Sequence, residues 1–150
     1  MLRSLLASSR GCQPQREVEL LIEAMRLVRG PMVAGAEQGS YTWMARVRAA
    51  HQYNALVVDA AHRIVELIGG TDPDGAAMAI ATGLAVVDLD QGLWRDRLRL
   101  AAQRGRGELE REVHGLLSAA GADDLAQVDP ATAALVEDLA PGLSVARRPA

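Results

Sequence analysis

Residues 41–84 decide the fold, and their sequence is YTWMARVRAAHQYNALVVDAAHRIVELIGGTDPDGAAMAIATGL. Between Tyr41 and Ile68 an apolar or small residue recurs every three or four positions, which is the period of one face of an α-helix. The members of this stripe are Trp43, Val47, Ala50, Asn54, Val57, Ala61, Ile64 and Ile68. The pattern therefore predicts one long helix over residues 41–68, with Asn54 as the only polar break in its apolar face.

A second helix begins directly after this one. Gly69-Gly70 ends the long helix, and Asp72 is placed to accept hydrogen bonds from the free backbone N–H groups of the next first turn. Pro73 suits the first helical position, and a negative Asp74 is favourable at the positive end of the helix dipole. These residues predict a helix that runs to about Val87.

The same signals extend the helical pattern over most of the chain. Further helices are expected from Arg16 to Gly30, after a cap at Asp88 or Asp90, from Glu108 to Ala120, and after Asp129-Pro130. No segment has the alternation of a strand. We predict an all-α fold of five to six helices, with a disordered tail over residues 1–15, one helical domain over 16–142 and a second tail over 143–150.

Composition agrees with closely packed helices. Of the 150 residues, 49% are hydrophobic but only 3% are aromatic, and there is no Phe, so the core must be built from Leu, Val, Ile, Met and Ala. Such a mixture suits helices better than a β-sandwich, whose strands favour aromatic and β-branched residues.

The helix pairs resemble one another after a shift of about 33 residues, which is the period of tetratricopeptide repeats. The shift places Ala61, Val65, Ala76, Ile80 and Leu84 on Trp94, Leu98, Leu109, Val113 and Leu117. One helix pair cannot bury its apolar faces alone, so pairs stack and form a concave groove. We therefore expect a tetratricopeptide-like stack of antiparallel helix hairpins.

Several short segments also resemble a known family. They are Leu27-Val28-Arg29-Gly30-Pro31, Tyr41-Thr42-Trp43, Val58-Asp59-Ala60-Ala61-His62-Arg63, Asp72-Pro73 with Ala76 and Ala79, Gly83-Leu84, Leu93-Trp94-Arg95-Asp96, and Asp129-Pro130 with Thr132 and Leu135. In order and spacing they resemble the bacterial transcriptional activator domain, the tetratricopeptide-like module of actinobacterial antibiotic regulatory proteins. The resemblance covers about four-fifths of the chain, from about Leu20 to Leu139. At Val87–Gln91 the chain lacks the proline of the family's junction.

The resemblance implies a non-catalytic module of a transcriptional regulator that binds a protein partner or self-associates through a helical groove. Family members bind DNA with an N-terminal winged helix, and the 15 residues of the predicted tail leave no room for one. DNA contact is therefore expected only through a partner or another domain. Within the groove, Tyr41, Tyr53, Arg95 and Arg99 are the candidate partner-binding residues, because Tyr and Arg are enriched at interfaces.

Two other functions remain open. Arg95, Arg97, Arg99, Arg104 and Arg106 form the one basic concentration, and a direct DNA-binding regulator would use them on phosphates. Acidic neighbours and a net charge of −3 favour a solvated helix instead.

A metal-binding helical protein or an enzyme would rest on Asp59, His62 and Glu66, which share a helix face at i, i+3 and i+7. Side-chain ion pairs are the favoured interpretation of that face. His51 lies too far from His62 to share a metal, and His114 is expected at the boundary of the core.

No residue pattern indicates catalysis or a cofactor. No Ser–His–Asp arrangement has a nucleophile motif, and Gly105-Arg106-Gly107 is a turn between helices, so we expect neither an enzyme nor a bound cofactor. The single Cys12 can form neither an internal disulfide nor a thiolate-based zinc site. No segment has the roughly 18 apolar residues of a membrane span, and a cytoplasmic location is expected.

Overall fold

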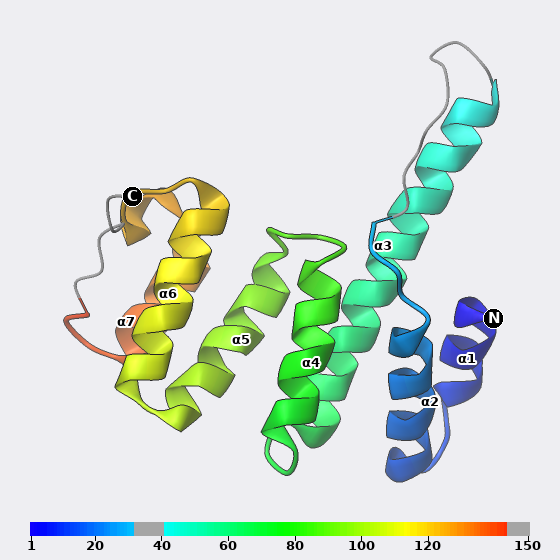
Figure 1. Cartoon of the computed structure of the whole chain (residues 1–150), viewed down its shortest axis with the longest axis horizontal. Helices are drawn as coiled ribbons and strands as arrows, with labels where there is room; N and C mark the ends of the chain where they lie inside the picture. Colours follow the sequence, from blue (N-terminus) through cyan, green and yellow to red (C-terminus); the bar gives the residue numbers. More distant parts are fainter. Residues whose placement is uncertain (32–40, 144–150) are drawn as a thin grey trace. The chain divides into compact units, whose positions relative to one another are not determined.

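Helices joined by turns form the described part of the chain. The computed structural model describes residues 1–31 and 41–143, without the side chains of residues 41–43. Over these ranges it contains seven α-helices, one short 3-10 helix and no strand (Figure 1). The elements are α1 (Leu2–Ser9), α2 (Pro14–Arg26), α3 (Tyr41–Ile68), α4 (Pro73–Leu84), α5 (Gln91–Arg104), α6 (Arg106–Ala120), η1 (Leu125–Gln127) and α7 (Pro130–Leu139). The all-α prediction is confirmed, with one helix more than expected.

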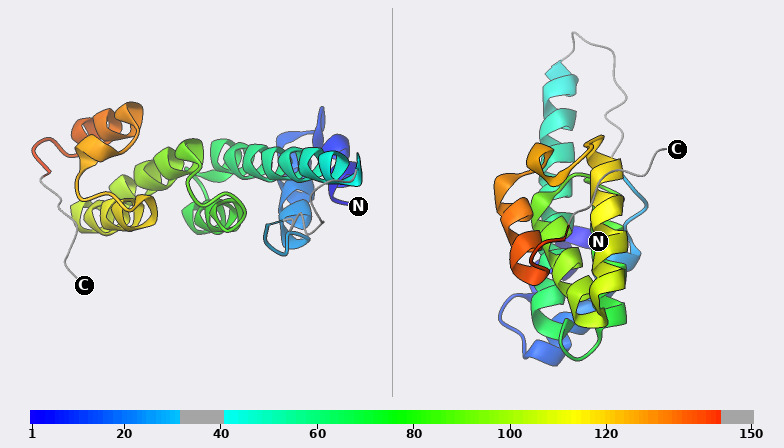
Figure 2. Two further views of the ribbon diagram at one scale, coloured as in Figure 1. Left: turned by 90° about the horizontal axis from the view of Figure 1, so that it is seen from above. Right: turned by 90° about the vertical axis from the view of Figure 1, so that its left-hand side faces the viewer.

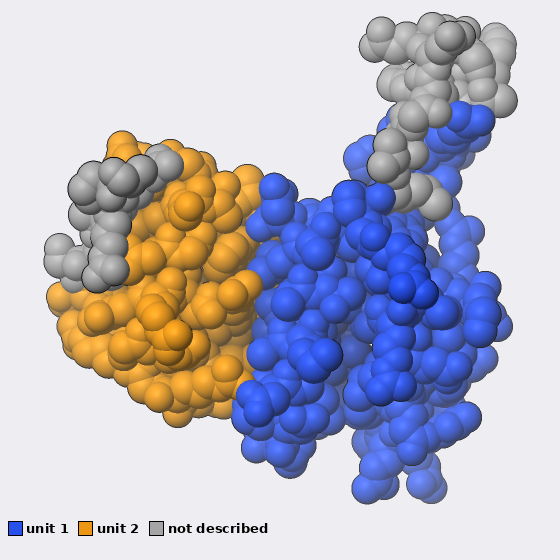
Figure 3. All heavy atoms as spheres, in the orientation of Figure 1, with its two compact units in different colours: residues 1–88 blue, residues 89–150 orange. Residues whose placement is uncertain are grey.

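The helices group into two compact units, coloured separately in Figure 3. Unit 1 comprises residues 1–88 and unit 2 residues 89–150. The boundary between them falls inside the single domain that the sequence predicted over residues 16–142.

Unit 1 is built around the C-terminal half of α3. Val57, Ala61 and Ile64 are completely buried there, because both α2 and α4 pack on this half of the helix. Figures 1 and 2 show α4 lying alongside it. The two helices are neighbours because only residues 69–72 connect them, and a short connection between helices favours an antiparallel hairpin.

Unit 2 is built around α5, which packs against both α6 and α7. Leu93, Leu98, Leu109 and Val113 are almost completely buried between α5 and α6. One residue, Gly105, separates these two helices, and its φ of 114° lies in a region that residues with a side chain rarely adopt. A glycine is therefore required at this sharp reversal.

The positions matched by the 33-residue shift have corresponding environments in the two units. Nine of the ten are buried, and only Val65 is half-exposed. The shift therefore aligns the buried faces of one helix hairpin in each unit.

The predicted helix caps are confirmed. Asp72, Asp90 and Asp129 each accept a hydrogen bond from a backbone N–H of the following first turn, at 2.9–3.0 Å. Of the two candidates before α5, the cap is Asp90.

Two helices end earlier than predicted, α2 at Arg26 and α4 at Leu84. The apolar pattern continues past both ends in turn residues such as Val86, which is buried without being helical.

The predicted disordered tail over residues 1–15 is wrong for its first part, because residues 2–9 form α1. Leu2, Leu5, Leu6 and Ser9 follow the i, i+3, i+4, i+7 pattern and face inward, and α1 packs mainly on α2. The Ser9 hydroxyl is buried and donates to the Leu6 carbonyl at 3.0 Å. So short an apolar pattern becomes a helix only because α2 supplies a surface for it.

Packing of α1 predicts a stability effect at Leu6, whose side chain is 8% exposed. Leu6→Ala removes buried apolar volume and is expected to lower the free energy of unfolding by about 2–3 kcal/mol. Urea denaturation followed by circular dichroism measures this loss. Leu89→Ala, at a leucine that is 42% exposed, is the matched control and should cost less than about 1 kcal/mol. Equal losses in the two variants would contradict the packing of α1.

The start of α4 supplies a second prediction. An added methyl group at Gly75 would collide with the capping carboxylate of Asp72 and come within 3.2 Å of Ile68. Gly75→Ala is therefore expected to destabilise the protein although alanine is the better helix former. Asp72→Ala should cost about 1 kcal/mol in the same thermal or urea unfolding measurement. In a protein that already carries Asp72→Ala, Gly75→Ala should lower the free energy of unfolding by less than it does alone. If the two losses of free energy simply add, the cap and Gly75 do not interact.

Candidate functional site

The N-terminal half of α3 stands apart from the packed part of unit 1. Among the side chains described from Met44 onward, the buried ones are Val57, Ala60, Ala61 and Ile64, all in the C-terminal half of the helix. Between Met44 and Leu56 every described side chain is exposed or half-exposed. Figure 1 shows this half of α3, in cyan, extending beyond α2 and α4. It is therefore a helix surface that the described part of unit 1 leaves largely uncovered.

A shallow groove follows this uncovered half of α3. Its volume is about 390 Å³, and it is lined by Met44, Val47, Arg48, His51 and Gln52. Met44 is 61% exposed, which is unusual for a large apolar side chain. We call these five residues the α3 groove.

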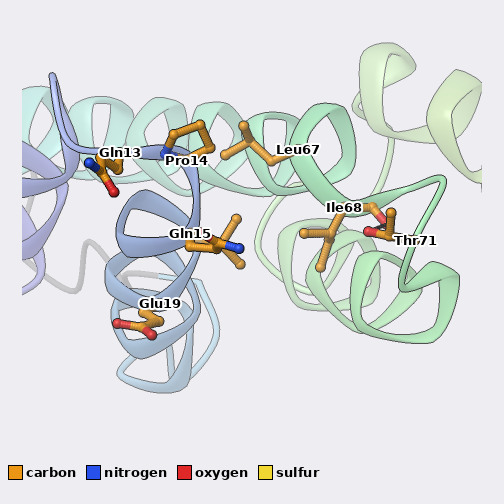
Figure 4. A pocket seen from close by; sticks show the side chains of 8 residues that line it. Gln13, Pro14, Gln15, Glu19, Leu67, Ile68 and Thr71 are labelled. Carbon is orange, nitrogen blue, oxygen red and sulfur yellow. Dashed lines mark hydrogen bonds between the residues drawn. The ribbon is translucent and has the colours of Figure 1, made fainter.

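A second groove lies where α2 begins and α3 ends. It measures about 660 Å³, and Figure 4 shows most of its lining side chains. The lining residues are Gln13, Pro14, Gln15, Val18, Glu19, Leu67, Ile68 and Thr71. Glu19, its one charged residue, is already ion-paired with Arg16 at 2.7 Å. Its polar groups are otherwise neutral, so the groove has no charge pattern that selects a ligand.

The two predicted groove tyrosines have different outcomes. The hydroxyl of Tyr53 donates to the Gly30 carbonyl at 3.2 Å, so this half-buried side chain holds the segment after α2 against α3. The side chain of Tyr41 lies outside the described residues. The role of both in partner binding stays a prediction.

The two predicted groove arginines belong to unit 2, and each makes contacts within its own unit. Arg95 lies 3.2 Å from the Asp129 carboxylate and 3.4 Å from the Thr132 hydroxyl, so it ties α5 to the start of α7. Arg99 lies 3.2 Å from the carboxylate of Asp96, which is buried. Both guanidinium groups are partly exposed, and their part in a partner groove also stays a prediction.

Arg97 and Arg106 of the basic concentration also meet carboxylates. Arg97 forms a two-pronged pair with Glu112, at 2.5 and 3.1 Å, and its guanidinium lies 5.2 Å from the centre of the Trp94 ring. Arg106 lies 3.4 Å from Glu110. Pairing of this kind competes with phosphate for the same N–H donors, so the geometry disfavours the direct DNA-binding alternative.

Asp59, His62 and Glu66 do not form a metal site in the structure. His62 Nε2 lies 3.6 Å from Glu66, whose other oxygen accepts from Arg63 at 3.0 Å. Asp59 instead lines a small cavity of about 100 Å³ beside Leu6. Within residues 1–31 and 44–143, no group of three or more His, Cys, Asp or Glu side chains is arranged to hold a metal ion.

The other singled-out polar residues occupy separate places. Exposed His51 lines the α3 groove, and half-exposed His114 lies on α6. The thiol of Cys12 donates to the Ser8 carbonyl at 3.0 Å. Sequence reasoning missed the groove residues Met44 and Arg48. The available signal was the absence of any Asp or Glu between Glu37 and Asp59.

Comparison with protein-family models, with curated proteins and with solved structures finds no match for this chain. The resemblance to the bacterial transcriptional activator domain therefore stays an expectation from the sequence. Among the helices of the described ranges, none combines the length and the apolar character needed to cross a membrane.

A salt bridge between α2 and α3 predicts how stability changes with pH. Both oxygens of Glu17 accept hydrogen bonds from Arg63, at 2.8 and 3.0 Å, and these bonds hold the pKa of Glu17 below its usual value. Because the pKa of Glu17 is lowered in the folded state, the pair stabilises the protein at pH values above the unfolded-state pKa of about 4.3. This stabilisation is lost as the pH falls through the lowered pKa of the folded state. Glu17→Gln should therefore lower the urea midpoint at pH 7.

As the pH falls through the lowered pKa of Glu17, the carboxylate becomes protonated in the folded state as well, and the urea midpoints of Glu17→Gln and the unaltered protein should converge. Glu23→Gln, at an exposed glutamate on the same helix, is the control and should change the midpoint little at either pH. If the urea midpoint of Glu17→Gln stays below that of the unaltered protein by the same amount at low pH, the ion pair is not the cause of the difference.

Proposed function

We propose that this protein is a non-catalytic protein-interaction or oligomerisation module of a bacterial transcriptional regulator, acting through a helical surface. The observation that carries the proposal is the uncovered half of α3. Among the described side chains of this 28-residue helix, all the buried ones lie in one half, while the other half exposes Met44 over a shallow groove. Exposed apolar side chains in a groove are characteristic of surfaces that bind other proteins.

The architecture supports the same proposal. Each unit contains a helix hairpin with matched buried positions at the tetratricopeptide period, and such hairpins commonly present binding surfaces on their uncovered faces. The assignment to transcription comes from the resemblance to the bacterial transcriptional activator domain alone. We further propose a cytoplasmic location, which that role requires.

Direct DNA binding is the weaker candidate. Arg95, Arg97, Arg99 and Arg106 each meet a carboxylate of the same chain, and these ion pairs would have to open before phosphates took their place.

Site-specific cross-linking tests the interaction role. A photoactivatable residue at Met44 is expected to cross-link to another protein, or to a second copy, in cells of the source organism. The same residue at exposed Met78 of α4 provides the matched control, because it replaces the same residue type at a comparable exposure. Two results together would refute the role: the protein sediments as a monomer in sedimentation velocity, and position 44 gives no cross-linked product beyond that obtained at position 78.

A gel-shift assay with duplex DNA separates the two candidates. No retention is expected at about 50 mM salt, where contacts to phosphate are strong. Retention that the double variant Arg95→Ala/Arg99→Ala abolishes would favour the DNA-binding alternative instead.

A further inference from the structure

We propose that the α3 groove binds an acidic amphipathic helix of a partner protein. This inference rests on the proposed function, because it names the surface and the chemistry of the partner. Its components are an apolar pair, Met44 and Val47, and cationic groups that no carboxylate of the described chain neutralises.

The apolar component follows from the helical register. Met44, Val47, Arg48 and His51 stand at i, i+3, i+4 and i+7, so they line one face of α3. An amphipathic helix placed in a groove inserts its own side chains at this same spacing. Methionine suits such a contact because its unbranched, polarizable side chain adapts to the surface that it meets.

Arg48 gives the groove a positive charge. This exposed side chain makes no hydrogen bond or ion pair in the described structure. Arg3 of α1, 49 residues earlier in the chain, reaches the same place and donates to Gln52 Oε1 at 2.9 Å. Because that partner is a neutral amide, it leaves the charge of Arg3 available to a carboxylate.

The two arginines come from two helices: Arg48 lines the groove, and Arg3 reaches Gln52, another of its lining residues. This arrangement contrasts with Arg95, Arg97 and Arg99 of α5, which meet carboxylates of their own unit. A partner helix that presents carboxylates beside an apolar stripe would complement both components of the groove.

Other occupants fit these observations less well. Nucleic acid requires a track of cations along its phosphates, and Arg48 is the one arginine that lines the groove. An anionic membrane requires a larger exposed apolar face than Met44 and Val47 offer. Pairing with the same groove of a second copy would place like charges opposite each other.

A binding titration with defined peptides tests the proposal. The probe is a fluorescent, helix-forming peptide of about 15 residues with leucines at i, i+3, i+4 and i+7 and glutamates on both flanks. Its counterpart carries glutamine at every glutamate position. The full chain is expected to bind the glutamate peptide at least about tenfold more tightly than the glutamine peptide in fluorescence anisotropy.

Variants locate the binding. Arg48→Glu is expected to weaken binding of the glutamate peptide at least about tenfold, whereas Arg48→Lys, which keeps the charge, stays within about threefold. The matched control is Arg111→Glu, which makes the same change of charge at an arginine that is 75% exposed on α6, and it should leave the affinity unchanged. Thermal melts of all three variants check that each is folded.

Three results would overturn the proposal. They are equal affinity for the two peptides, equal weakening by Arg48→Glu and Arg111→Glu, and no binding of the glutamate peptide. Single-stranded DNA or anionic phosphatidylserine vesicles that bind in its place, with the same dependence on Arg48, would assign the groove to a polyanion. Self-association that Arg48→Glu abolishes would assign it to a second copy.

Failure of this inference can be distinguished from failure of the proposed function. If Met44 cross-links to a partner and Arg48→Glu does not reduce the yield of that cross-link, the interaction role stays intact and the acidic helix is rejected. Absence of both a cross-link and self-association rejects the role itself.

Discussion

Burial of the C-terminal half of α3 is the interaction on which unit 1 depends. Val57, Ala61 and Ile64 are fully removed from solvent there because α2 and α4 both pack on this half. Ala60 and Ala61 are small enough to let neighbouring helices approach closely, and the larger Val57 and Ile64 fill the space between them. Together these four residues place the central helix of the unit.

The same constraint determines which part of α3 is left for function. A 28-residue helix is longer than the two helices that cover it, of 13 and 12 residues, so its N-terminal half projects beyond them. The covered half has the apolar residues of a core, whereas the projecting half carries Arg46, Arg48 and His51 beside Met44 and Val47. One helix therefore combines a structural half with a surface suited to a partner.

Arginine has two roles in this chain, and sequence proximity does not distinguish them. The cluster at 95–106 is the densest group of cations, yet Arg95, Arg97 and Arg99 meet Asp129, Glu112 and Asp96 and so stabilise unit 2. Arg48 meets no carboxylate of the described residues and is more available to a partner. Availability depends on where the carboxylates lie in space, and for Arg95 and Arg97 the partners are 34 and 15 residues away.

The sequence by itself determined the all-helical class, the bounds of α3, the cap at Asp72 and the helix start at Asp129-Pro130, and it left Asp88 and Asp90 open as the cap of α5. These features are local: a helical face repeats within four residues, and a cap reaches a backbone N–H three residues ahead. Only the tertiary structure decided that residues 2–9 form a helix, that residues 1–88 and 89–150 are separate units, and that Arg3 lies beside Gln52. Each of these depends on contacts between residues far apart in the chain, and a periodic pattern does not specify which distant surface it meets.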